Sequence, residues 1–126
     1  MNLILDTGAL IALERNDREM WRRLELARGR GDDAPTHGGV VGQAWRGDGP
    51  REALLAKALK GVDIKSLDEE LGRAAGVLLG RARGSDVIDA ALVLLAADGD
   101  RIATSDVEDL RPLAEESGVH IDLIAV

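Results

Sequence analysis

The chain has 126 residues, of which 45% are hydrophobic and 31% charged, with a net charge of -7 and no cysteine, phenylalanine or tyrosine. The absence of cysteine excludes disulfides and thiolate zinc sites, and it favours a reducing cytoplasm. The acidic balance excludes proteins that coat nucleic acid through a basic face, and the lack of Phe and Tyr excludes aromatic base-stacking platforms. No leader pattern or apolar run of membrane-spanning length is present, so we expect one soluble domain, residues 1–126, without a membrane partner.

The hydrophobic patterning predicts an alternation of short strands and helices. In chain order we expect a strand at 3–5, helices at 8–13 and 18–28, a strand at 34–36, helices at 40–46 and 51–60, a strand at 62–65, helices at 67–82 and 86–97, a strand at 101–104, a helix at 106–117 and a strand at 119–124. Helices between almost every pair of strands predict the α/β class, with a mainly parallel sheet covered by helices on both faces.

Three of these helices carry N-terminal capping signals. Thr7 precedes the first helix and can cap it. Ser66 with Glu69, and Ser105 with Glu108, have the spacing of capping boxes. We therefore expect Thr7, Ser66 and Ser105 as the capping residues of their helices.

Carboxylates gather at the ends of the predicted strands. Asp6 follows the apolar strand at 3–5, and Asp106 follows the strand at 101–104 in the same way. If these strands are neighbours in an open sheet, the two carboxylates face each other across the crevice where such sheets bind ligands. Asp86 and Asp89 are three residues apart on one helix face, and Asp89 borders a long apolar run. Converging carboxylates repel one another unless a metal neutralises them, and an oxygen-only set favours Mg²⁺ or Mn²⁺.

Some of these acids have a simpler interpretation. Asp6, Asp86 and Asp106 all stand at helix starts, where an acid stabilises the helix dipole without any further role. Asp109 has the position of a surface acid in a first helical turn. A cap does not explain Asp89, because an acid beside an apolar helix requires a cation or a donor.

Four short motifs give the chain a resemblance to PIN-domain proteins of the VapC toxin type. They are LILDTGALI at residues 3–11, VVGQAWR at 40–46, DVIDAAL at 86–92 and ATSD at 103–106. The resemblance covers essentially the whole chain. It implies a PIN-like three-layer α/β/α sandwich whose mainly parallel five-stranded sheet has the order 3-2-1-4-5.

The resemblance also implies a set of site residues. Asp6, Asp89 and Asp106 would be catalytic acids and metal ligands, and Asp86 a nearby helper and further ligand. Gln43 stands where the family has a second acid, a Glu, and Gly8 stands where it often has Ser or Asn. The amide oxygen of Gln43 can accept a hydrogen bond, but it brings no charge to the site. Supporting roles are expected for Thr7, Gln43, Asp86 and Ser105.

The implied function is a Mg²⁺- or Mn²⁺-dependent endoribonuclease that hydrolyses phosphodiester bonds in structured RNA such as tRNA. Its partners would be the RNA substrate and a small VapB-type antitoxin, and homodimers are common in the family. RNA would need a local basic rim. The candidates are the pairs Arg28 and Arg30, Arg46 and Arg51, and Arg81 and Arg83, of which Arg46, Arg81 and Arg83 are preferred.

A second interpretation is a PIN-like module that binds RNA or an antitoxin and has weakened catalysis, because Gln43 replaces the usual Glu. A third, a receiver-like phosphoacceptor domain, is rejected. That fold requires paired acids after the first strand and a late Lys, whereas Asp6 stands alone and no Lys follows Lys65.

Overall fold

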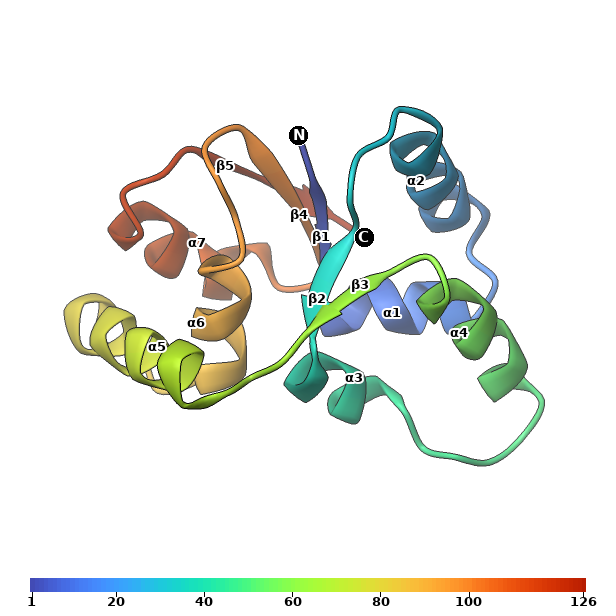
Figure 1. The fold of residues 1–126 in the computed structure, drawn as a ribbon, viewed down its shortest axis with the longest axis horizontal. Coiled ribbons are helices and arrows are strands. Elements are labelled where there is room, and N and C mark those ends of the chain that lie inside the picture. The colour runs from blue at the N-terminus through green and yellow to red at the C-terminus, as the bar shows by residue number, and fades with distance from the viewer.

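The computed structural model describes residues 1–126 and contains five strands and seven helices (Figure 1). In chain order they are β1 (Leu3–Leu5), α1 (Thr7–Glu14), α2 (Arg18–Gly29), β2 (Pro35–His37), α3 (Gly38–Ala44), α4 (Arg51–Leu59), β3 (Asp63–Lys65), α5 (Glu69–Ala82), α6 (Val87–Val93), β4 (Asp100–Thr104), α7 (Val107–Glu116) and β5 (Ile121–Ala125). The order of elements is the one predicted from the sequence. No helix is long and apolar enough to cross a membrane.

All strand pairs are parallel, which confirms the expected α/β class. β1, β4 and β5 form one sheet in the order β1-β4-β5, and β2 pairs with β3 in a second ladder. β2 lies beside β1, where Leu3 N donates to Asp33 O (3.1 Å) and Thr36 Oγ1 donates to Leu5 O (2.7 Å). These two contacts do not make a ladder, so the full 3-2-1-4-5 order is present only as two adjoining pieces.

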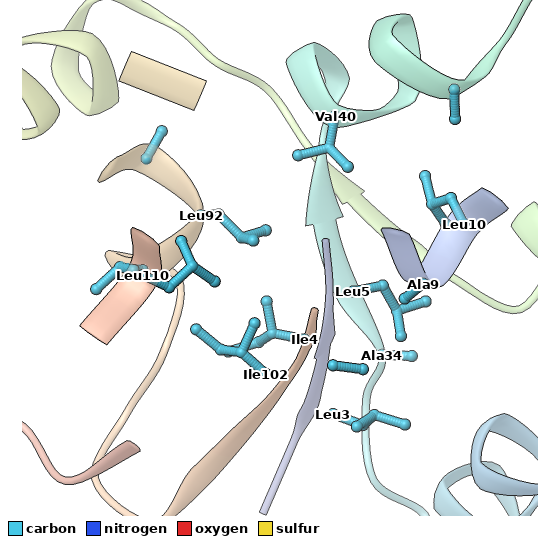
Figure 2. Close-up of a cluster of buried hydrophobic side chains, with 14 of the residues drawn as sticks. Leu3, Ile4, Leu5, Ala9, Leu10, Ala34, Val40, Leu92, Ile102 and Leu110 are labelled. Carbon is cyan, nitrogen blue, oxygen red and sulfur yellow. The ribbon is translucent and has the colours of Figure 1, made fainter. Parts of the chain in front are cut away.

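β1 is buried on both of its faces, which explains its uninterrupted apolar sequence. Leu5 points toward Ala9 of α1, Leu3 points to the same side of β1, and Ile4 points the other way, toward Ile102 and Leu92 (Figure 2). Figure 1 shows α1, α2 and α4 on one side of β1 and α5, α6 and α7 on the other. A short strand can hold its place in the sheet because its side chains complete two hydrophobic layers at once.

The helix caps differ from those expected. Asp6, not Thr7, caps α1, since its side chain accepts a hydrogen bond from Thr7 N. Asp68, not Ser66, caps α5, because only Asp68 lies directly before the first helical residue and reaches Leu71 N (2.9 Å). The Ser105–Glu108 box does not form, and the residue that precedes α7 is Asp106, whose side chain makes no capping hydrogen bond.

Helix α6 ends at Val93, four residues before the predicted end at 97, because a buried acid turns the chain. Asp100 is 4% exposed, and its carboxylate accepts hydrogen bonds from Ala97 N and Asn2 N, both at 2.8 Å. The Ala97 N–H is thereby drawn out of the helical pattern. Asp100 joins the N-terminal segment to the turn before β4, which a local helix pattern does not reveal.

Asp100→Ala is expected to lower the free energy of unfolding by roughly 2–4 kcal/mol, because it leaves two backbone donors without partners. Urea unfolding followed by circular dichroism measures the loss. The matched control is Asp98→Ala, which removes one exposed contact to His120 N and should cost roughly 0.5–1.5 kcal/mol. Equal losses in the two variants would contradict the structural role of Asp100.

Candidate active site

A polar pocket of about 320 Å³ lies at the carboxyl ends of β1 and β4. These two strands are paired neighbours, and the helices that follow them, α1 and α7, begin at the pocket. Open parallel sheets bind ligands at this edge. Its lining residues are Asp6, Thr7, Gly8, Ile11, Gln43, Asp86, Asp89, Ser105, Asp106 and Asp109. The structure therefore brings together all seven acidic and supporting residues that the sequence predicted.

Asp6 is the most firmly held of the acids. It is 4% exposed, its Oδ1 accepts from Thr7 N and its Oδ2 accepts from Thr104 Oγ1, both at 2.7 Å. The Thr104 hydroxyl also accepts from Asp106 N at 2.9 Å. Burial raises the pKa of Asp6, the bonds from Thr104 and Thr7 lower it, and repulsion from Asp106 and Asp86 adds to the rise. The carboxylate is thus fixed in orientation but electrostatically uncompensated.

Asp89 lies half-buried in the first turn of α6, and its carboxylate accepts no hydrogen bond from the protein. Burial raises its pKa to about 7, with further contributions from the negative charges of Asp86, Asp6, Asp106 and Asp109. A carboxylate that is desolvated and faces only like charges binds a proton or a cation. This is the acid that the capping interpretation could not explain, and the structure gives it no partner.

Asp86 and Asp106 differ in how much of each carboxylate remains free. Asp86 caps α6, because its Oδ1 accepts from Ile88 N (2.9 Å) and Asp89 N (3.1 Å), so only Oδ2 is free. Asp106 makes no capping bond and keeps both oxygens free at the pocket. The helix-cap interpretation therefore holds for Asp86, and for Asp6 at α1, but not for Asp106.

Asp109 is an exposed acid in the first turn of α7, as expected, and it also lines the pocket. It stands three residues after Asp106, and α7 presents both residues to the pocket. Asp86 and Asp89 have the same separation on α6. The repeated i,i+3 spacing was the available signal, because residues so spaced share a helix face.

Gln43 reaches the pocket from α3, where the Thr7 hydroxyl donates to its Oε1. A second polar contact positions α3 itself. His37 is fully buried, its Nδ1 accepts from Gly39 N (3.1 Å), and its Nε2 lies 2.9 Å from Ile88 O. Because Nδ1 is an acceptor in this contact, the ring proton is on Nε2 and is donated to Ile88 O. His37 thus joins α3 to α6 one residue before Asp89, a role that the sequence did not reveal.

Sterics explain why residue 8 is a glycine. A Cβ at Gly8 would lie 2.8 Å from Ser105 N and would also overlap the Ser105 side chain. Helix α1 therefore approaches the loop after β4 as closely as it does only because residue 8 has no side chain. Ser105 fills the space that a larger residue at position 8 would need.

The chemistry of the donor set fits a divalent cation, although the acids do not form a closed cage. No group of three or more His, Asp or Glu side chains is arranged to hold a metal ion in this structure. Five carboxylates nevertheless line the pocket, and no basic side chain lines it. Free oxygens remain on Asp86, Asp89, Asp106 and Asp109. Oxygen donors of this kind are those that Mg²⁺ and Mn²⁺ prefer.

The three predicted RNA-contact arginines are placed differently from one another. Arg83 lines a second cleft of about 340 Å³, which shares Asp86, Asp89 and Asp109 with the acidic pocket. It adopts a left-handed conformation (φ 57°) at the end of α5. Arg46 folds back on the end of α3, donating to Gly42 O (3.2 Å) and Trp45 O (2.9 Å). Arg81 lines neither cleft.

No protein-family model and no curated protein matches the chain. Among solved structures, its fold is similar to the crystal structure of VapBC2 from Rickettsia felis bound to a DNA fragment from their promoter. The TM-score is 0.71, the sequence identity is 12%, and 98% of each chain is covered. The chain has the fold of a VapBC toxin–antitoxin component. At this identity the similarity concerns the fold alone, and it is consistent with the PIN-like α/β fold expected from the sequence.

The raised pKa of Asp89 predicts how the stability of the metal-free protein depends on pH. Burial raises the pKa of Asp89 from its ordinary value of 3.8 to about 7 in the folded chain, so the folded chain binds the proton more tightly. Stability should therefore fall as pH rises through this window, and the penalty is complete above pH 7. Thermal unfolding in EDTA should show Asp89→Asn more stable than the unaltered protein at about pH 8, with a smaller difference at about pH 5.

The matched control is Asp48→Asn, which removes an exposed acid in the loop between α3 and α4. This variant should leave the difference in thermal stability between the two pH values the same as in the unaltered protein. A stabilisation by Asp89→Asn that is equal at both pH values would show that burial and repulsion of the Asp89 charge are not its cause.

Proposed function

We propose that this protein is a Mg²⁺- or Mn²⁺-dependent endoribonuclease, the toxin of a VapBC-type toxin–antitoxin pair. The observation that carries the proposal is the placement of Asp6, Asp89 and Asp106 on one pocket with no compensating base. The fold similarity to a VapBC component adds to it. The substrate would be a structured RNA such as tRNA, and the products would carry 5′-phosphate and 3′-hydroxyl ends.

In this proposal Asp6, Asp89 and Asp106 hold the metal, with the free oxygen of Asp86 as a further ligand. When bound, the ion would offset the negative charge of the cluster and polarise the phosphodiester. Asp6 is the anchor, because Thr104 and the Thr7 amide fix both of its oxygens. Asp106 is better suited than Asp86 to orient the attacking water, since one Asp86 oxygen is committed to the α6 cap.

Gln43 takes the place of an acid and so lowers the charge that the pocket can offer a metal. Its contact with Thr7 keeps the amide at the pocket rim. Because Thr7 follows the anchoring Asp6, we propose that Gln43 supports the position of the α1 start. Ser105 supports the same region by packing against Gly8.

The partners in this proposal are RNA and a small VapB-type antitoxin, in a cytoplasmic homodimer. The similar structure is itself a VapBC complex bound to promoter DNA. Arg83 is the best placed of the three arginines to contact RNA, because its cleft adjoins the acidic pocket.

A second candidate function is a binding module with weakened catalysis. Two observations favour it: the acids form no closed metal cage, and a neutral Gln43 occupies the position of an acid. Such a module would bind RNA or an antitoxin without cleaving RNA efficiently.

The nuclease proposal predicts cleavage of structured RNA by the purified protein with Mn²⁺ or Mg²⁺. Removing the metal with EDTA should abolish cleavage, and Asp6→Asn or Asp89→Asn should slow it by roughly 100-fold or more, because even outer-shell changes at metal sites cost about 10- to 100-fold. The measurement is the rate of loss of intact RNA on a denaturing gel. Asp122→Asn, an exposed acid on β5, is the matched control and should cleave at the unaltered rate.

Cleavage that survives both EDTA and Asp6→Asn would overturn the nuclease proposal. Calorimetric titration with Mn²⁺ then separates the two functions. Metal binding that is lost in Asp89→Asn supports the enzyme, whereas RNA binding without either metal binding or cleavage supports the binding module.

The position of Arg83 predicts a local contribution to RNA binding. Arg83→Asn removes the charge but keeps a residue that tolerates the left-handed conformation, so the fold should be retained. RNA affinity should fall by roughly 3- to 10-fold, with a shallower dependence on salt, because one phosphate contact is lost. Fluorescence anisotropy with labelled RNA measures both effects. Arg15→Gln, an exposed arginine outside both clefts, should change neither, and an equal effect there would contradict the assignment.

A further inference from the structure

β5 is the open edge of the β1-β4-β5 sheet. Val126 N donates to Thr104 O (2.9 Å), and His120 O accepts from Gly99 N (2.8 Å), so the even-numbered positions face β4. In a parallel ladder the alternate residues point their backbone groups the other way. The N–H and C=O groups of Ile121, Leu123 and Ala125 therefore point outward. Natural proteins usually prevent strand addition by placing a proline, a lysine or a bulge on an edge strand. β5 has none of these.

An arginine groove lies on the α2 side of this edge, away from the acidic pocket. It has a volume of about 300 Å³ and is lined by Glu19, Arg22, Arg23, Leu26, Ala27, Arg30, Arg101 and Ile124. Four arginines stand against one glutamate, and Glu19 pairs only with Arg22 (2.7 Å) and Arg23 (3.3 Å). In a chain of net charge -7, this is a local concentration of positive charge.

Two of the arginines in the groove have no acidic partner. Neither Arg30 nor Arg101 has a carboxylate within 4.0 Å. The Nε atom of Arg101 is buried and has no hydrogen-bond partner at all. A buried donor without an acceptor is costly, so Arg101 is held in the groove without the compensation that a carboxylate would give.

A second groove lies on the α7 side of β5, and four of its eight lining residues are hydrophobic. It has a volume of about 390 Å³, and its apolar residues are Ala114, Val119, Ile121 and Leu123. Its charged side chains are Arg111, Glu115 and Asp122, and Asp122 Oδ1 lies 3.2 Å from Nε2 of His120, which also lines the groove. The edge strand thus separates a basic groove from one whose lining is half apolar and half polar.

We propose that β5 is a docking edge for an extended segment of a partner protein in which acidic and apolar residues alternate. The segment adds to β5 as a further strand and uses the outward backbone groups of residues 121, 123 and 125. Successive side chains of a strand point to opposite faces, so one row enters the arginine groove and the other meets the apolar residues of the α7-side groove. Charge complementarity selects acids for the first row, opposite the unpaired Arg30 and Arg101.

This docking edge does not depend on the nuclease proposal. The arginine groove contains Arg101 at the start of β4, whereas the acidic pocket begins after Thr104 at the other end of that strand. A partner bound at β5 therefore leaves the acidic pocket open. Failure of RNA cleavage and failure of peptide binding are separate results.

The test uses the full chain and a fluorescein-labelled synthetic peptide of about six residues that alternates glutamate and valine, enough to span β5. Anisotropy should show saturable binding. A peptide with lysine in place of glutamate should bind at least tenfold more weakly. The single variant Arg30→Gln should weaken binding of the glutamate peptide by roughly tenfold or more, and so should the double variant that combines Arg30→Gln with Arg101→Gln. Arg15→Gln, an exposed arginine outside the groove, should bind it unchanged.

The strand-addition geometry is tested by amide hydrogen exchange. Peptide binding should slow exchange at Ile121, Leu123 and Ala125, and Ala125→Pro, which removes an outward donor without touching the ladder to β4, should weaken binding where Ala125→Val does not. Arg30→Gln is an exposed change, so its result stands even if the Arg101 variant folds poorly.

Equal binding of the lysine and glutamate peptides would overturn the proposal, as would protection that maps away from β5. A third outcome would also overturn the proposal. If labelled RNA binds the unaltered chain but not the Arg30→Gln variant, and the glutamate peptide binds neither protein, the groove is a nucleic-acid site.

Discussion

One hydroxyl group, that of Thr104, joins the two strands on which the site depends. It donates to Asp6 Oδ2 and accepts from Asp106 N, so the last residue of β4 fixes the acid after β1 and the start of its own loop together. The parallel pairing of β1 with β4 aligns Leu5 with Ala103, and this register places the Thr104 hydroxyl within hydrogen-bond distance of Asp6. Slippage of this pairing by one residue would turn Thr104 to the opposite face and separate the two acids.

The acidic pocket is assembled at an electrostatic cost that the hydrophobic layers on both sides of β1 must offset. Burial raises the pKa of Asp6 and Asp89, and the neighbouring carboxylates add to both shifts. The positions of α1, α6 and α7 are nevertheless fixed, by Gly8 packing on Ser105 and by the His37 contact with Ile88 O. Preorganised like charges without a base are an arrangement suited to a cation rather than to folding stability.

Charge is distributed unevenly over the molecule. The acids converge at the carboxyl ends of β1 and β4, whereas four arginines line the groove between α2 and the sheet. The net charge of the chain gives no indication of this separation, because it averages over both regions. The proposed RNA contact at Arg83 and the proposed docking edge at β5 would therefore lie on different parts of the molecule and bind different ligands.

The sequence by itself determined the order of elements, the parallel α/β class and the set of acids, because hydrophobic periodicity and strand-end carboxylates are local patterns. Asp6, Asp86, Asp89 and Asp106 were all found in this way. Asp109 was correctly predicted as an exposed first-turn acid, but its place at the pocket was not, because that depends on how α7 packs. The contact of His37 with Ile88 O was not predicted either, because the two residues are distant in the sequence. The caps at Ser66 and Ser105 were wrong for a related reason: several polar residues compete at a helix start, and the tertiary path of the chain selects among them. The early end of α6, the open edge of β5 and the partnerless Arg101 were decided by the tertiary structure alone, because each depends on groups that are distant in the sequence and meet only when the sheet forms.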